Sequence, residues 1–264
     1  MQQNDFSWIS SGTTHVGTVR EVNEDNFIER PELGLWVVAD GMGGHSAGDI
    51  ASTMVVDALS VIERKGTNEE FIQKIIDELS ITNQKLRQMA FSRFGKKSMV
   101  GSTVVILVCY EGQYTILWAG DSRAYLYQNG SLGQVTRDHS HVNELIDSGA
   151  LPPEEAESHP LANVITRAIG AAQDLNVERL DGELTPGDIF LLCSDGLNKE
   201  LTDGEIEQFF KTENVVDINK ALIHSALIRG AKDNITAISV KIDDEDEADD
   251  YTVPAQSLRA TDAI

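Results

Sequence analysis

The sequence predicts an α+β fold in which antiparallel sheets carry helices on their faces. Apolar runs with strand character come in groups, near the N-terminus, between residues 103 and 127, and again near residue 240. Segments with helical periodicity lie between these groups, but strands and helices do not alternate one by one. A parallel doubly wound sheet requires that alternation, so antiparallel sheets are favoured. The length of 264 residues and the lack of an internal repeat predict one domain.

The first half of the chain contains two predicted strands and two predicted helices. Residues 6–14 and 33–39 are the strands, and the second is apolar enough to be buried. After a glycine cluster, a helix is predicted at 50–62, because small and apolar side chains recur there on one side: Ala51, Met54, Val55, Ala58 and Leu59. Asn68 is the predicted N-cap of a long helix that reaches about residue 92.

The second half begins with three strands connected by short turns. They are predicted at 103–110, 114–119 and 124–127, and the turn-forming pair Asn129-Gly130 ends the third. A helix at 142–151 leads into an irregular, proline-containing stretch that lasts to Asn163. The remaining predictions are strands at 177–180, 189–193 and 236–242 and helices at 203–211 and 215–229.

The formal net charge of −22 at pH 7 argues against two classes of partner. Nucleic acids and anionic membranes both require a basic surface. Seven carboxylates fall between Asp243 and Asp250, and residues 243–264 hold too little apolar surface to pack. We therefore expect a folded domain over residues 1–242 and a disordered acidic tail over residues 243–264.

Both cysteines are predicted to be buried structural thiols. Cys109 and Cys193 lie inside apolar runs, and they fit neither a disulfide framework nor a zinc site. The polar opening residues do not resemble a signal peptide, and no apolar stretch approaches the roughly 18 residues that span a membrane. We expect a monomeric cytoplasmic protein that binds neither nucleic acid nor membrane.

Several aspartates stand at the edges of apolar runs. Asp40 follows the run 35–39, Asp195 follows 189–193, and Asp233 shortly precedes 236–242. A carboxylate beside an apolar core is costly unless it is paired or bound to a cation. A glycine turn between strand and helix would explain one such motif, but not three. The pattern predicts a site for Mg²⁺ or Mn²⁺, which prefer oxygen ligands.

Gly41 and Arg20 extend this predicted site. The glycines after Asp40 let the backbone approach a ligand closely and present a carbonyl oxygen to it. Arg20 precedes the acidic pair Glu24-Asp25. A surface Arg–Glu pair contributes little to stability, but a guanidinium beside a metal cluster can hold a phosphate through two parallel hydrogen bonds.

These motifs, in this order, resemble those of bacterial-type metal-dependent protein phosphatases, the PPM or protein phosphatase 2C-like family. The resemblance covers about residues 8–242. The matching stretches are 20–25, 40–45, 101–103, 120–123, 135–140, 163–170, 191–197 and 233–234. The resemblance implies a four-layer αββα sandwich, in which two antiparallel β-sheets are flanked by helices and a metal cleft lies at one end of the sheets.

The resemblance also implies a ligand set for two tightly held Mn²⁺ or Mg²⁺ ions. Asp40 matches an aspartate that bridges both ions, and Gly41 matches a carbonyl ligand of one of them. Asp195 and Asp233 match carboxylates of the second ion. These four residues would form the centre of the cleft.

Other matches imply supporting roles around these two ions. Glu24 and Asp25 match acids that act directly or through bound water. Asp121, with Asp195, matches a weaker third-metal site. Arg20 matches the arginine that holds the substrate phosphate. The block containing Ser102 and Thr103 would lie beneath the cleft.

The general acid and the substrate-binding flap are less closely specified. Eukaryotic members have a histidine directly after the Asp-Gly pair, whereas this chain has Met42 there and His45 three residues later. His45 is a candidate general acid, with a structural role in the turn as the alternative. The segment from Asp147 to Val164 matches a mobile flap beside the cleft, which would contact the substrate protein around the phosphoresidue.

The function implied is a serine/threonine protein phosphatase that hydrolyses phosphoserine and phosphothreonine monoesters by direct attack of a metal-bridging water or hydroxide. It would act on phosphoproteins and oppose a bacterial Hanks-type Ser/Thr kinase. One alternative is an inactive relative that serves as a binding module, but such a protein would be expected to lack metal aspartates. Another is an acidic calcium-binding or scaffold protein, although EF-hand spacing is absent from the sequence.

Overall fold

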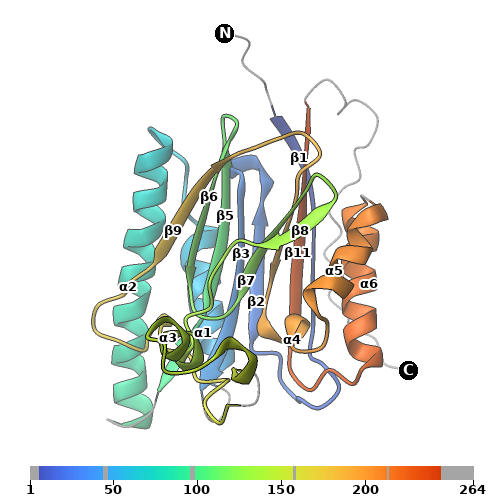
Figure 1. Cartoon of the computed structure of the whole chain (residues 1–264). Coiled ribbons are helices and arrows are strands. Elements are labelled where there is room, and N and C mark those ends of the chain that lie inside the picture. Colours follow the sequence, from blue (N-terminus) through green and yellow to red (C-terminus); the bar gives the residue numbers. More distant parts are fainter. Residues whose placement is uncertain (1–5, 44–46, 96–98, 157–158, 213, 245–264) are drawn as a thin grey trace.

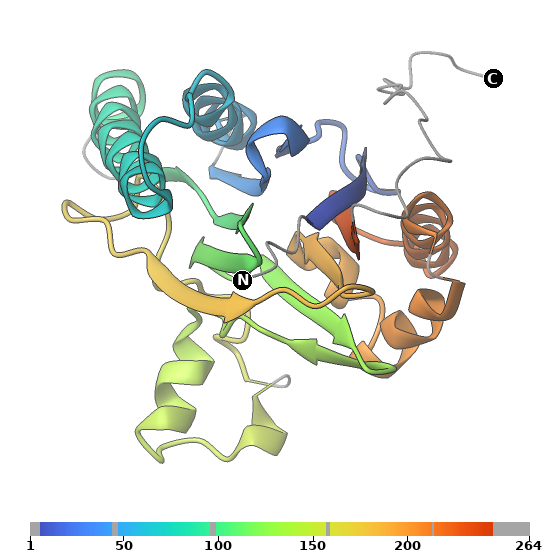
Figure 2. The same ribbon diagram turned by 90° about the horizontal axis from the view of Figure 1, so that it is seen from above.

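The computed structural model describes residues 6–43, 47–95, 99–156, 159–212 and 214–244, which form a sandwich of two sheets between two layers of helices (Figures 1 and 2). One sheet has the strand order β1-β11-β10-β7-β8, and the other has the order β2-β3-β5-β6-β9, with β4 also paired to β3. Every pair of neighbouring strands is antiparallel. The four-layer αββα architecture is therefore confirmed.

The strands of the first sheet come from both ends of the chain and from its middle. They are β1 Phe6–His15, β7 Arg123–Gln128, β8 Ser131–Gln134, β10 Ile189–Cys193 and β11 Ile235–Asp244. The second sheet is built mainly from the first half of the chain. Its strands are β2 Asp25–Arg30, β3 Leu35–Gly43, β4 Val100–Ser102, β5 Val104–Tyr110, β6 Gln113–Ala119 and β9 Glu178–Glu183.

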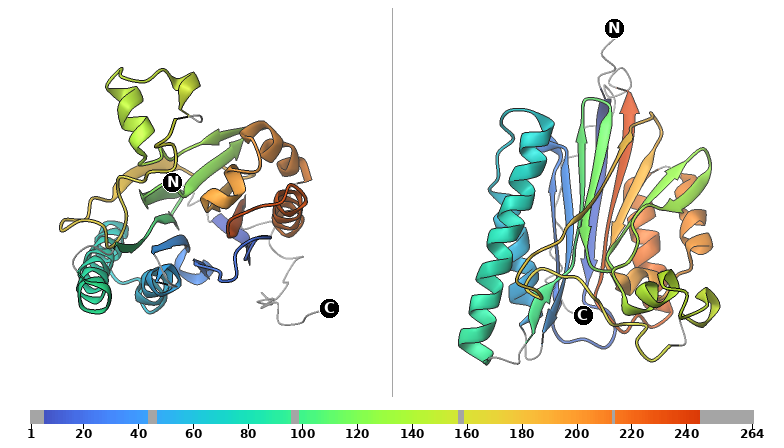
Figure 3. Two further views of the ribbon diagram at one scale, coloured as in Figure 1. Left: turned by 90° about the horizontal axis from the view of Figure 1, so that it is seen from below. Right: turned by 60° about the vertical axis from the view of Figure 1, so that its left-hand side comes forward.

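The helices divide between the two outer faces. The second sheet is covered by α1 Gly48–Ser60 and α2 Asn68–Phe94, and the first by α4 Asp195–Asn198, α5 Asp203–Phe209 and α6 Val215–Ile228 (Figure 2). The short helix α3 His141–Asp147 and the 3₁₀ turn η2 Pro153–Glu155 stand out from the sandwich (Figure 3). Two further 3₁₀ turns are η1 Pro31–Leu33 and η3 Phe210–Thr212.

The central strands are apolar along their whole length because both of their faces are buried. In β10, Leu191 packs in the core under the helices, whereas Phe190 and Leu192 pack in the core between the sheets. In β3, Val37 packs in the core under the helices and Trp36 packs in the core between the sheets. Side chains alternate across a strand, so a strand between two cores needs apolar residues at every position.

The long helix α2 begins one residue earlier than the sequence indicated. Thr67, rather than Asn68, is its N-cap: the Thr67 side chain accepts a hydrogen bond from the Glu70 backbone N–H, and the Glu70 carboxylate accepts one from the Thr67 backbone N–H. This reciprocal capping box satisfies two donors that the first turn cannot pair internally. The helix then covers α1 and the second sheet with one apolar side.

Four short or polar elements were not predicted: β2, β4, β8 and α4. The predicted helix at 142–151 is shorter, because α3 ends at Asp147 and the chain turns through Gly149 with φ 73°. The last strand is longer than expected, since β11 reaches Asp244, which pairs with Phe6 of β1. The disorder predicted for residues 243–264 is wrong for Asp243 and Asp244, which pair with β1 in β11, and residues 245–264 lie outside the described residues.

Candidate active site

Aspartates from both sheets meet at the end of the sandwich where β2, α4 and β11 begin. Asp40 lies in β3, Asp25 opens β2, and Asp121 follows β6. Asp195 is the first residue of α4 after β10, and Asp233 shortly precedes β11. Burial raises the pKa of Asp40 well above its ordinary value, and the negative charges of the other four aspartates raise it further. The structure thus brings together the five aspartates that the sequence singled out.

Asp25 is a buried carboxylate that joins the two sheets. Its Oδ2 accepts hydrogen bonds of 2.7 Å from the hydroxyls of Ser194, beside β10, and Thr236, in β11. Burial raises the pKa of Asp25 to about 7, and these two hydrogen bonds only partly oppose that rise. A buried carboxylate held in this way is ready to bind a cation, which would favour its charged form.

Asp40 is held in place by the backbone and hydroxyls beneath it. Its carbonyl oxygen accepts a hydrogen bond of 2.8 Å from the Thr103 N–H and one of 3.1 Å from the Ser102 hydroxyl. Its own N–H donates to the Thr103 hydroxyl at 3.1 Å. The bonds of Ser102 and Thr103 fix the strand from which the Asp40 side chain projects, and their place beneath a metal cleft stays a prediction.

Asp121 and Asp195 form the part of the cluster nearest to Lys199. The Nζ atom of Lys199 contacts Asp195 Oδ2 and lies 3.8 Å from Asp233 Oδ2. Burial raises the pKa of Asp121 to about 7, and the charge of Asp195 adds to that rise. Its buried Oδ1 atom has no hydrogen-bond partner within the described residues. Such an atom is costly to bury unless a cation or water meets it.

The loop that carries Glu24 approaches the glycine stretch around Gly41 very closely. The Gly41 N–H donates to the Glu24 carbonyl at 3.0 Å, and the Gly48 N–H donates to the Glu24 carboxylate at 3.1 Å. A Cβ atom on Gly41 would lie 2.0 Å from the Gly48 carbonyl oxygen. Only glycine fits at this position, because the Gly48 backbone occupies the space that a side chain would need. Burial raises the pKa of Glu24.

Asn234 ties the same loop to the start of β11. Its side-chain amide donates to the carbonyls of Val16 and Val22 at 2.9 and 3.1 Å, and its Oδ1 accepts from the Glu24 N–H at 2.8 Å. All of the side chain's polar atoms are therefore engaged in shaping the loop from residue 16 to residue 24. Arg20 and Glu24 owe their positions to these contacts.

Arg20 lies at the solvent-facing edge of the cluster. Its Nη2 atom is 3.0 Å from Asp233 Oδ1, and about half of its side chain is exposed. A guanidinium that pairs with only one carboxylate keeps other N–H donors directed outward. Arg20 thus lies beside one of the acids with much of its side chain in solvent, and its role in holding a phosphate stays a prediction.

The residues present fit a hard divalent cation, since the converging side chains are carboxylates and polar oxygen groups. No three His, Cys, Asp or Glu side chains within the described ranges are arranged to hold a metal ion as they stand. Lys199 and Arg20 take up part of the charge of Asp195 and Asp233. Mg²⁺ and Mn²⁺ also keep several waters, so the acids need not close tightly around the ion.

The candidate general acid and the predicted flap are not placed in the aspartate cluster by the structure. His45 lies outside the described residues. In the segment from Asp147 to Val164, Leu151 is buried, whereas Leu161 is 38 % exposed. The base of the flap is closed by an isolated β-bridge between Ser140 and Ile165.

Sequence reasoning missed Lys199 and Thr236, and it gave no role to Ser194 and Asn234, although both lie in the motifs that it singled out. Lys199 stands four residues after Asp195, a spacing that places both side chains on one side of a helix. Asn234 adjoins Asp233, and Ser194 precedes Asp195, so their closeness to acidic motifs was the available signal. Thr236 offered none, because its contact with Asp25 spans 211 positions.

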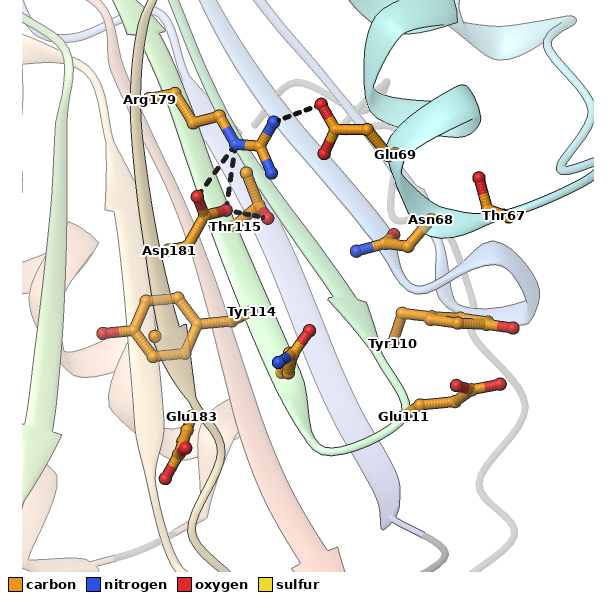
Figure 4. Close-up of a pocket in the computed structure, with 12 residues that line it drawn as sticks. Thr67, Asn68, Glu69, Tyr110, Glu111, Tyr114, Thr115, Arg179, Asp181 and Glu183 are labelled. Carbon is orange, nitrogen blue, oxygen red and sulfur yellow. Dashed lines mark hydrogen bonds and ion pairs between the residues drawn. The ribbon is translucent and has the colours of Figure 1, made fainter.

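A hollow of about 780 Å³ lies at the opposite end of the sheets from the aspartates, beside the turn between β5 and β6 (Figure 4). Three of its charged groups are engaged with one another: Arg179 pairs with Glu69 at 2.7 Å and with Asp181 at 2.9 Å. It is remote from the aspartate cluster and does not share its chemistry.

Comparison with known proteins identifies the family. The family model for protein phosphatase 2C matches residues 12–244. The serine/threonine phosphatase Stp of Listeria innocua is 36 % identical over 240 residues, which cover 86 % of this chain and 93 % of the relative. Protein phosphatase PhpP of Streptococcus pneumoniae is 35 % identical over 240 residues, covering 88 % of this chain and 97 % of the relative.

Solved structures agree with this assignment. PppA, described as a key regulatory component of T6SS in Pseudomonas aeruginosa, has a TM-score of 0.83 and 42 % identity, with 90 % of this chain and 100 % of that chain covered. The catalytic domain of PstP in complex with two manganese ions has a TM-score of 0.81 and 29 % identity, and the match covers 91 % of this chain and 100 % of that chain. The chain belongs to the protein phosphatase 2C (PPM) family and is a metal-dependent serine/threonine protein phosphatase of the bacterial type.

Proposed function

We propose that this phosphatase hydrolyses phosphoserine and phosphothreonine monoesters of proteins in one step, without a covalent phosphoenzyme. The observation that supports this most is the meeting of five aspartates with an outward-facing arginine at one end of the sandwich. Neither cysteine suits a nucleophilic role, because both are buried and burial raises the pKa of Cys109 and Cys193.

Two Mn²⁺ or Mg²⁺ ions, when bound, would neutralise the charge of the phosphate and lower the pKa of a water molecule. Asp40 would contribute to both ions, with Asp195, Asp233 and the Gly41 carbonyl as further ligands. Glu24 and Asp25 would hold the ions either directly or through bound water. A third ion is proposed to bind more weakly at Asp121 and Asp195.

Arg20 is proposed to bind and orient the phosphoryl group. A phosphomonoester carries nearly two negative charges at neutral pH, and a guanidinium can hold two of its oxygens in parallel hydrogen bonds. Fixing the phosphorus in line with the attacking oxygen contributes to the rate by positioning. The serine or threonine oxygen that leaves must receive a proton, and His45 remains our candidate donor.

The substrates are proposed to be phosphoproteins made by a Hanks-type Ser/Thr kinase, with the phosphatase acting as a cytoplasmic monomer. Within the described part of the chain, every helix is too short or too polar to cross a bilayer. The similarity to PppA makes regulation of T6SS the first setting in which to look for substrates.

The test is metal-stimulated hydrolysis of p-nitrophenyl phosphate and of a phosphothreonine peptide. Mn²⁺ should activate the wild-type protein, and Asp40→Asn should remove nearly all of that activity while the circular dichroism spectrum stays unchanged. Asp181→Asn is a matched control, because it makes the same change in the remote hollow. Wild-type activity that survives exhaustive EDTA treatment would contradict the metal mechanism.

A further inference from the structure

Lys199 places a positive charge among the acids predicted to hold the weaker third ion. Its Nζ atom contacts Asp195 Oδ2 and lies 3.8 Å from Asp233 Oδ2. It is also close enough to Asp121 for its charge to lower the pKa of that carboxyl. Asp25, by contrast, takes its hydrogen bonds from Ser194 and Thr236. Lys199 therefore sits on the outer side of the cluster, where Asp121 and Asp195 meet.

The local structure directs the Lys199 side chain to this point. The short helix α4 ends at Asn198, and Lys199 is its C-cap, with its N–H donating to the Asp195 carbonyl at 2.9 Å. Residues four apart lie on the same side of a helical turn. The Asp195 side chain is only 14 % exposed, whereas that of Lys199 is 38 % exposed, so the ammonium group reaches a mostly buried carboxylate from the solvent side.

We propose that Lys199 is a tethered cation that competes with a divalent ion for Asp121 and Asp195, and so weakens the third metal site. This inference rests on the proposed two-ion function. An ammonium group on these acids reduces the negative potential that attracts a divalent ion. The side chain is 38 % exposed, so its flexible stem can withdraw into solvent when an ion enters at high concentration. The third site is thereby weakened rather than abolished.

The competition is measured by counting Mn²⁺ ions bound to the full chain, by electron paramagnetic resonance of free Mn²⁺ and by calorimetry. Lys199→Met keeps an unbranched stem of similar length but removes the charge. We expect it to bind the third ion about tenfold more tightly, and the second ion, which also uses Asp195 and Asp233, no less tightly than the wild type does. A tenfold change corresponds to about 1.4 kcal/mol. The melting temperature of this variant should rise more on addition of Mn²⁺ than that of the wild type does.

Three further variants separate competition from other effects. Lys199→Arg retains the charge and should leave the third site weak. Lys65→Met makes the same change in net charge at an exposed lysine paired with Glu63, and should leave every Mn²⁺ affinity unchanged. Adding Asp121→Asn to Lys199→Met should abolish the gain in affinity, because the gained ion needs that carboxylate.

Two results would overturn the inference and can be told apart. Equal third-ion affinities in the wild type, Lys199→Met and Lys199→Arg, with two tight ions intact, would overturn the role of Lys199 alone. A wild-type protein that binds fewer than two Mn²⁺ ions tightly would overturn the proposed function and the role of Lys199 with it.

Discussion

Asp25 and Asp40 lie directly opposite each other on the neighbouring antiparallel strands β2 and β3. Opposed residues in such a pair point to the same face of the sheet, and like charges placed there are destabilising. Burial raises the pKa of Asp40, and the charge of Asp25 is the next largest cause. The pair is therefore a strained feature of the metal-free protein that a divalent cation would relieve.

The first prediction concerns the stability of the metal-free protein as a function of pH. Burial raises the pKa of Asp25 to about 7, well above its value in an unfolded chain. The folded state therefore binds more protons than the unfolded state between about pH 4 and pH 7. Stability from this group is fully present below that window and is lost as the pH rises through it.

In EDTA, the melting temperature should consequently fall between pH 5 and pH 8, and Mn²⁺ should offset the fall. Asp25→Asn should flatten the dependence, since a neutral amide has no proton to lose. Thermal melts followed by circular dichroism across this pH range would check the sign. An EDTA-treated wild type that becomes more stable from pH 5 to pH 8 would contradict it.

The second prediction concerns Arg20. Replacing it with Gln should lower kcat/KM for p-nitrophenyl phosphate by roughly 10- to 100-fold, the effect expected for hydrogen bonds to a charged group. The two tight Mn²⁺ ions should still bind, because Arg20 pairs only with the edge of the cluster at Asp233. Arg20→Lys should recover only part of the loss, since an ammonium cannot form the paired hydrogen bonds of a guanidinium.

Steady-state kinetics and Mn²⁺ titrations on the same preparations test both parts of this prediction. Arg20→Gln with normal kcat/KM would exclude the phosphate-binding role. A loss of tight Mn²⁺ binding would assign Arg20 to the integrity of the metal site instead.

The third prediction concerns Asn234. Asn234→Ala leaves two carbonyls and one N–H of the loop without their partner, which costs on the order of 1–3 kcal/mol of unfolding free energy. Because the same loop carries Glu24 and Arg20, we also expect weaker Mn²⁺ binding and lower activity. Urea unfolding and calorimetric Mn²⁺ titration measure the two effects separately.

Asn219→Ala is the matched control for this loss of a buried amide. Asn219 lies on the buried side of α6, away from the aspartate cluster. Its amide donates to the carbonyls of Ser11 and Ala237, and its Oδ1 accepts a hydrogen bond from the Ser239 hydroxyl. It should lose stability without losing Mn²⁺ affinity. If both variants weakened Mn²⁺ binding equally, the effect of Asn234 would be one of general stability.

The fourth prediction concerns the flap. Glu154 and Glu155 are exposed in the turn η2, and Glu157 lies outside the described residues. Changing all three to glutamine should lower kcat/KM for a phosphopeptide with basic neighbours, through lost charge complementarity, and should barely change p-nitrophenyl phosphate hydrolysis. Equal changes on both substrates would show that the segment acts through the metal centre or through stability.

The fold class, the long elements and the acids of the candidate metal site could be recognised in the amino-acid sequence. The buried strands β3, β5, β6 and β10 were visible because strands enclosed on both faces are apolar at every position. The helices α1, α2 and α6 were visible from their apolar periodicity. Asp40, Asp195 and Asp233 were visible because a carboxylate at the edge of an apolar run is costly without a partner.

Tertiary structure alone decided which distant groups meet. The element β2 is half-exposed and polar, and β4 and β8 are short, so none of them carried a strong local pattern. The contacts of Asp25 with Thr236 and of Glu24 with Asn234 span 211 and 210 positions, and they exist because β2 and β11 begin at the same end of the sandwich. Local sequence patterns record propensity and burial, whereas a site formed by contacts of this range depends on how the two sheets pack.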